Sequence, residues 1–71
     1  MKLDELKFNE GENWAHSLYK GWDFYRAVTG LTTTIKGNYD IHRGSIVIPI
    51  YKNVDPLMAQ AILCAIEKGE L

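Results

Sequence analysis

Two histidines and a single cysteine are the residues of this chain with the clearest capacity for metal or nucleophilic chemistry. A zinc site needs three or four ligands held close together. Asp40 and His42 are two residues apart, so their side chains project from the same face of an extended strand. His16 is distant from them in sequence, and two ligands do not make a site. We therefore expect no metal site and no cofactor, with both histidines on solvated polar surfaces.

Cys64 has poor surroundings for catalysis. A reactive thiol lies in an electropositive, partly open environment, whereas Cys64 is flanked by Leu63, Ala65 and Ile66. A thiol in such surroundings packs as a small apolar side chain and suits a reducing compartment. The glutamates lie mostly near the ends of the chain, and the glycines are typical of turns instead of a phosphate-binding loop. The sequence therefore predicts a protein that is not an enzyme.

The charge balance restricts the classes of partner. Eight Lys and Arg residues stand against nine Asp and Glu residues, which gives a formal net charge of −1. Dedicated nucleic-acid binders carry a basic excess that neutralises phosphates. No stretch approaches the roughly 20 apolar residues of a membrane span, and residues 1–5 lack the apolar core of a signal peptide. We expect a cytoplasmic protein with no membrane partner.

The length of 71 residues predicts a single domain over residues 1–71, with residues 1–10 as a docking arm. A core of this size rarely supplies more than about 3–5 kcal/mol of stability, so such domains usually need a further stabilising device such as a disulfide, a metal or self-association. A single cysteine excludes a disulfide within the chain. The composition favours self-association as the source of additional stability, and we expect a homodimer.

The first long element that the pattern predicts is an amphipathic helix from about Glu12 to Thr29. It would be capped by Asn13, or by Asn9 if it begins earlier, and would end at Gly30. At 100° per residue one helix face gathers apolar side chains, namely Trp14, Leu18, Trp22, Tyr25 and Val28. Gly21 lies on that face, where it costs about 1 kcal/mol in a helix. We therefore expect another backbone or a large ring to approach it closely.

The middle of the chain is predicted to form two or three antiparallel strands. Residues 31–36 are rich in β-branched side chains, and Gly37-Asn38 is a turn pair. Residues 39–42 form a short second strand in the three-strand alternative. Residues 45–51 give the strongest strand pattern, with Pro49 favouring an edge or a bulge.

The C-terminal helix has the clearest start and stop signals in the sequence. Asp55 is the expected N-cap, Pro56 occupies the first helical position, and the helix runs over residues 57–68 up to Gly69. The predicted fold class is α+β: a helix, an antiparallel hairpin or three-strand meander, and a C-terminal helix. The simplest arrangement packs both helices on one face of the small sheet.

The apolar arc of the C-terminal helix spans about 260° on a helical wheel, more than one sheet and one neighbour require. Its expected core face is formed by Met58, Ala61, Ile62, Ala65 and Ile66. The remaining apolar side chains extend this face on both sides and are predicted to form the dimer interface, namely Leu57, Ala59, Leu63 and Cys64. In the alternatives to a dimer, these apolar residues are simply exposed to solvent, or the N-terminal arm of the same chain covers them.

Binding is the function class that remains. Aromatic residues and arginine dominate interface energetics, and those outside the predicted core are candidate contacts with a partner protein, namely Phe24, Tyr39 and Arg43. We expect a small protein-binding module that acts as a regulator or inhibitor by docking on a larger protein. The alternative is a nucleic-acid-contacting accessory protein, which would use the 36–52 hairpin with its cations and ring, namely Lys36, Tyr39, His42, Arg43 and Lys52.

Overall fold

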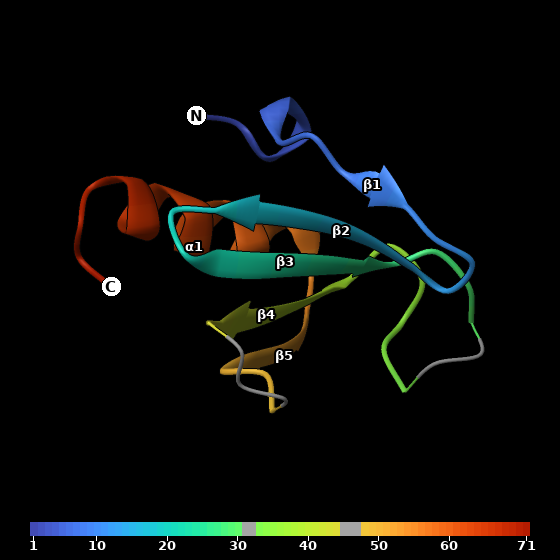
Figure 1. The fold of residues 1–71 in the computed structure, drawn as a ribbon. Coiled ribbons are helices and arrows are strands. Elements are labelled where there is room, and N and C mark those ends of the chain that lie inside the picture. The colour runs from blue at the N-terminus through green and yellow to red at the C-terminus, as the bar shows by residue number, and fades with distance from the viewer. Residues whose placement is uncertain (31–32, 45–47) are drawn as a thin grey trace.

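The computed structural model describes residues 1–30, 33–44 and 48–71. It contains a five-stranded antiparallel sheet in which the strands follow one another in chain order, and a C-terminal helix (Figure 1). The elements are the 3-10 turn η1 (Leu3–Glu5), β1 (Asn9–Glu10), β2 (Trp14–Tyr19), β3 (Trp22–Ala27), β4 (Tyr39–Arg43), β5 (Tyr51–Val54) and α1 (Pro56–Glu67). The α+β class with a small sheet is confirmed, but there is one helix instead of two.

The predicted helix over residues 12–29 is wrong, because this segment is the hairpin β2–β3. Tyr19 pairs with Trp22, and the two residues between them, Lys20 and Gly21, have φ angles of 49° and 81°. Two successive positive φ values define the type I′ turn, whose twist matches that of the flanking strands. An added Cβ at Gly21 would meet no atom within 4 Å. The glycine therefore serves the turn, and the close approach expected there is absent.

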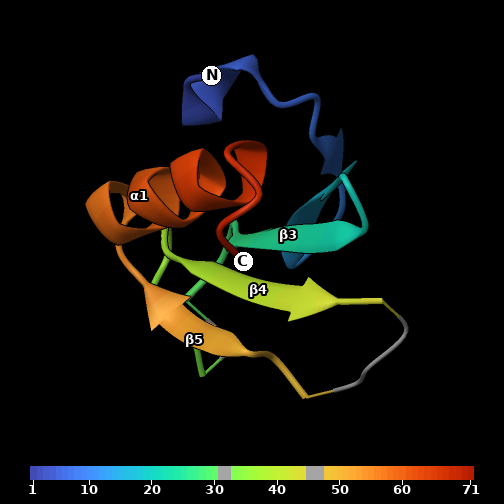
Figure 2. The same ribbon diagram turned by 90° about the vertical axis from the view of Figure 1, so that its left-hand side faces the viewer.

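The helix and the N-terminal segment cover one face of the sheet, and the Thr34–Asp40 hydrogen bond holds the 33–38 region against part of the other face. Helix α1 and the N-terminal segment lie on the same side of the sheet (Figure 2). Alternate strand residues point into this layer and pack against the inner face of the helix. The core comprises Leu3, Leu6, Trp22, Phe24, Tyr39, Ile41, Ala59, Ile62, Leu63 and Ile66. The inner face of α1 is therefore rotated relative to the predicted one, since Met58 is exposed and Ala59 is fully buried.

The central strand predictions are confirmed in part. Residues 39–42 belong to β4, but residues 33–36 form bends and a turn instead of a strand. In the segment 45–51, which had the strongest pattern, residues 48–50 are not a strand, and β5 begins at Tyr51. Residues 31–32 and 45–47 lie outside the described residues. The backbone around Gly37 instead pairs with β3, since the Gly37 N–H donates to the Ala27 carbonyl at 2.8 Å.

The C-terminal helix follows its sequence signals closely. The Asp55 carboxylate caps α1 by accepting a hydrogen bond from the Met58 N–H at 2.8 Å, and Pro56 is its first residue. Gly69 ends the helix with a φ of 75°. Within the described residues, no helix has the length and apolar character that crossing a bilayer requires.

Candidate functional site

Two of the three predicted partner contacts are core residues. Phe24 is 0% exposed and Tyr39 is 6% exposed, both beneath α1 and the N-terminal segment. The cause is the antiparallel pairing of the strands, because even-numbered residues of β3 and odd-numbered residues of β4 point toward the helix. Arg43 is exposed, and its guanidinium carbon lies 5.3 Å from the Trp22 ring centroid. These three residues therefore do not form a shared docking surface.

The predicted dimer interface is divided in a similar way. Ala59 and Leu63 are fully buried against their own sheet, so they cannot contact a second chain. Leu57 is 82% exposed, and Cys64 is half-buried. The Cys64 sulfur accepts a hydrogen bond from the Gln60 amide nitrogen at 3.5 Å. Of the four predicted interface residues, Leu57 at the start of α1 is therefore the one that is exposed to a second copy.

The cations and ring of the nucleic-acid alternative do not converge on one surface. In β4 the side chains of Tyr39 and Arg43 belong to the helix-covered face, whereas His42 belongs to the opposite face. Lys36 lies in the turn before β4 and Lys52 in β5. His42 and Lys52 line one cavity on the face opposite the helix, so the predicted contact residues are divided between the two faces of the sheet.

The face of the sheet opposite α1, which we call the open face, carries a group of contacting rings. The Tyr25 ring lies 4.7 Å from His16 on β2 and 5.0 Å from His42 on β4, measured between ring centroids. Trp14 meets Tyr25 edge-on at 6.2 Å. All four residues are half-buried. Three adjacent strands thus present a continuous aromatic surface, which Leu18 extends at 64% exposure.

Charged groups flank these rings. The His16 Nε2 atom and the Asp23 Oδ1 atom are 2.7 Å apart. Asp40 and His42 share the open face, as the sequence predicts, and both line an open cavity of about 320 Å³. Its other lining residues are Trp14, Tyr25, Thr33, Pro49 and Lys52. The cavity thus combines two aromatic rings, an imidazole, a carboxylate and an ammonium group.

A buried polar network fixes the rim of this cavity. The Asp40 Oδ1 atom accepts hydrogen bonds from the Thr34 hydroxyl at 3.0 Å and from the Asn53 N–H at 2.8 Å. Asn53 has a φ of 53°, and its side-chain oxygen accepts from the Ile35 N–H at 3.0 Å. One carboxylate therefore holds the 33–38 turn region to β5.

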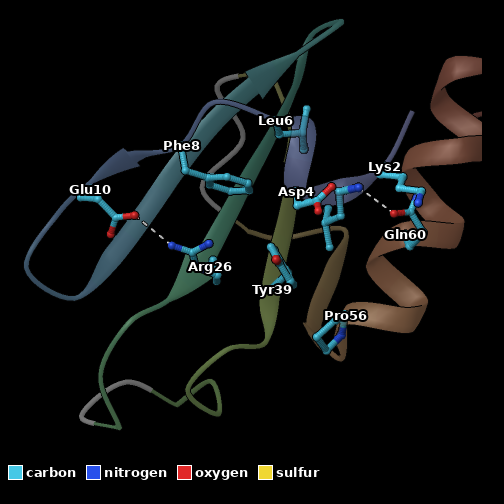
Figure 3. A pocket seen from close by; sticks show the side chains of 10 residues that line it. Lys2, Asp4, Leu6, Phe8, Glu10, Arg26, Tyr39, Pro56 and Gln60 are labelled. Carbon is cyan, nitrogen blue, oxygen red and sulfur yellow. Dashed lines mark hydrogen bonds and ion pairs between the residues drawn. The ribbon is translucent and has the colours of Figure 1, made fainter.

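A larger cavity of about 590 Å³ lies on the helix-covered side, between the N-terminal segment, β3, β4 and the start of α1 (Figure 3). Its lining residues are Lys2, Leu3, Asp4, Leu6, Phe8, Glu10, Arg26, Tyr39, Pro56 and Gln60. Arg26 and Tyr39 are cross-strand partners at its base. We call this space the arm cavity. The Met1 ammonium nearby bonds to Glu67, and this hydrogen bond raises the pKa of the ammonium.

Among the described residues, no three His, Cys, Asp or Glu side chains lie close enough together to hold a metal ion. Comparison with protein families, with curated proteins and with solved structures finds no match for this chain. Sequence reasoning missed Trp14, His16 and Tyr25 as neighbours, although the Lys20-Gly21 turn pair was the signal that would have aligned them.

Proposed function

We propose that this protein is a small protein-binding module that docks on a larger protein through the open face of its sheet. The observation that supports this proposal is the ring group of Trp14, His16, Tyr25 and His42 on a face that neither α1 nor the N-terminal segment covers. Aromatic side chains bury large areas at low entropic cost, and they are enriched among residues that dominate binding energy.

The charges of the open face favour a basic partner segment. Asp23 and Asp40 contribute two carboxylates to this face, against one ammonium from Lys52. An arginine side chain of the partner could lie against the rings and face the Asp40 carboxylate in the cavity, since cations are attracted to aromatic faces. A phosphate backbone would instead meet both carboxylates. We therefore propose a protein partner that presents arginine.

The docking itself is the proposed activity. A domain of 71 residues whose binding face is a rigid antiparallel sheet can act as a regulator or inhibitor by occupying a surface of its partner. No step of this proposal requires catalysis or a cofactor. The edges of the sheet are less suited to docking, because β1 has only two residues and β5, which contains the left-handed Asn53, pairs with β4 through a register shift.

The test is capture of a partner from the native host, followed by affinity measurement with the purified partner. Tyr25→Thr removes the central ring and keeps a residue that favours strands. It should weaken binding about tenfold or more, as expected for a central contact. Leu71→Gln is the matched control, since it removes an exposed apolar side chain that belongs to neither the open face nor the outer side of α1. Equal affinities of the Tyr25→Thr and wild-type proteins, with both folded, would contradict the proposal.

A binding measurement with single-stranded DNA distinguishes a protein partner from a nucleic-acid partner. Phosphate-driven affinity is strongest at low salt, so oligonucleotide binding is measured at about 50 mM salt. We expect none. Saturable oligonucleotide binding that Tyr25→Thr abolishes would overturn the protein partner and support base stacking on the open face.

The homodimer is a separate proposal that now depends on the outer side of α1. Leu57 and Met58 are the exposed large apolar residues there, at 82% and 53%. Light scattering coupled to size exclusion should show a dimer at high concentration. Leu57→Glu, which suits a first helical turn, should convert it to a monomer, and Leu18→Thr should not. A monomeric wild-type protein at every concentration would contradict the dimer.

A further inference from the structure

We propose that the arm cavity is a second binding site, for a carboxylate attached to a small apolar body. It lies on the helix-covered side of the sheet, away from the open face, so it does not depend on the proposed docking function. The inference rests on two groups at the base of the cavity, the Tyr39 hydroxyl and the Arg26 guanidinium, and on the apolar side chains around them (Figure 3).

The Tyr39 hydroxyl is available to a ligand. The residue is 94% buried, yet its hydroxyl makes no hydrogen bond within the described residues. No buried side-chain oxygen or nitrogen in that part of the chain lacks a partner. The hydroxyl is therefore not enclosed by protein, and it reaches the cavity that Tyr39 lines. A buried tyrosine usually finds a partner for its O–H group, so this hydroxyl can donate a hydrogen bond to a ligand in the cavity.

Arg26 supplies the charge for an anion. A guanidinium has five N–H donors, and one of them donates to Glu10 Oε1 at 3.0 Å. The guanidinium carbon also lies 5.0 Å from the Phe8 ring centroid, which holds the group in place beside Tyr39. Arginine binds carboxylates through paired, parallel hydrogen bonds. The unused donors can therefore receive a ligand carboxylate without any change of fold.

Glu10 occupies the position that a ligand carboxylate would take. Its side chain is 68% exposed, so its ion pair with Arg26 contributes little and is easily exchanged. The cavity is lined by two cations, Lys2 and Arg26, and two anions, Asp4 and Glu10. When a ligand monoanion replaces Glu10 on Arg26, the exposed Glu10 carboxylate is solvated by water instead. A phosphate group, with a charge of about −1.5 to −2 near neutral pH, would be repelled by both carboxylates.

The apolar side chains that line the arm cavity indicate what the ligand carries besides its carboxylate. Leu6, Phe8 and Pro56 line the space next to the charged groups. Apolar surface of a ligand is removed from water when it lies against such side chains. The chemistry therefore fits a small aromatic or aliphatic acid, or the C-terminal carboxylate of a peptide with an apolar last side chain.

The proposal is tested by titrating the ¹⁵N-labelled full chain with benzoate and following amide chemical shifts. We expect saturable shifts near residues 26 and 39, with a dissociation constant on the order of 1 mM. Arg26→Met keeps the apolar stem and should weaken binding about tenfold or more, since hydrogen bonds to charged groups are lost. Glu10→Gln removes the competing carboxylate and should strengthen binding about threefold. Tyr39→Phe, which keeps the buried ring, should weaken it about threefold.

The controls vary the arginine, the charge of the ligand and the source of the carboxylate. Arg43→Met alters the other arginine of the same sheet face and should leave benzoate binding unchanged. Benzamide, which lacks the charge, should not bind. A peptide ending in leucine, compared with its C-terminal amide, distinguishes a peptide terminus from a free acid as the source of the carboxylate. Absence of saturable shifts, or equal affinity of the Arg26→Met and wild-type proteins, would overturn the proposal.

Discussion

Phe24→Ala should lower the free energy of unfolding by about 3–5 kcal/mol, the cost of removing a fully buried aromatic ring. Phe24 lies on the central strand β3, between Ser17 of β2 and Ile41 of β4, and it is completely inaccessible. A domain of this size has a total stability of only about 3–5 kcal/mol. The variant should therefore be largely unfolded at room temperature, which far-ultraviolet circular dichroism and urea titration measure directly.

Two further variants keep this prediction testable when Phe24→Ala does not fold. Phe24→Leu retains most of the volume and should cost about 1.5 kcal/mol or less. Tyr25→Thr changes the adjacent residue, whose side chain lies on the open face, and should retain a cooperative unfolding transition. A Phe24→Ala protein as stable as the wild type would place this ring outside the core, on a surface where it could contact a partner.

Asp40→Ala should destabilise the fold by about 2–3 kcal/mol, because it removes one carboxylate that accepts hydrogen bonds from a buried hydroxyl and a part-buried N–H. These donors are the Thr34 hydroxyl and the Asn53 N–H, both bonded to the same carboxylate oxygen. The amide of Asn53 should also exchange with solvent much faster. Urea titration and hydrogen exchange followed by NMR give the global and the local effect.

Asp40→Asn provides the matched comparison for this network. It keeps an oxygen at the acceptor position and should cost about 1 kcal/mol or less. If alanine and asparagine at this position were equally mild, or if the Asn53 amide kept its protection in Asp40→Ala, the network would not hold the 33–38 region to β5.

The helix α1 could be predicted because its signals are local. Asp55, Pro56 and Gly69 act on the backbone within one turn of their own positions, so no tertiary information is needed to interpret them. Its inner face was less predictable. Nearly every side of this helix is apolar, and only contact with the sheet selects Ala59 and Leu63 over Met58 and Ala61.

The hairpin β2–β3 could not be recognised from apolar spacing alone. Trp14, Leu18 and Trp22 recur at four-residue intervals, which is a helical period. In the structure this spacing places Trp14 and Leu18 on the open face and Trp22 in the core, because the turn at Lys20-Gly21 reverses the chain. The richness in Trp, Tyr and Phe favoured strands, and it was outweighed by the periodicity.

The error at the hairpin explains the error at the candidate site. With residues 12–29 as a helix, Phe24 falls at the margin of the apolar arc and His16 on the polar side. With the same residues as two paired strands, His16 comes beside Tyr25, and Phe24 turns inward. The shared face of Asp40 and His42 was predictable, since it depends only on strand alternation within β4.

We propose that this domain binds its partner through the open face. The most direct measurement is an NMR footprint of the ¹⁵N-labelled chain bound to the captured partner protein. We predict that the Trp14 indole signal and the amides around Tyr25 and His42 shift or broaden, while those on the outer side of α1 are unchanged. A footprint confined to α1, with the signals of the open face unaltered, would contradict the claim.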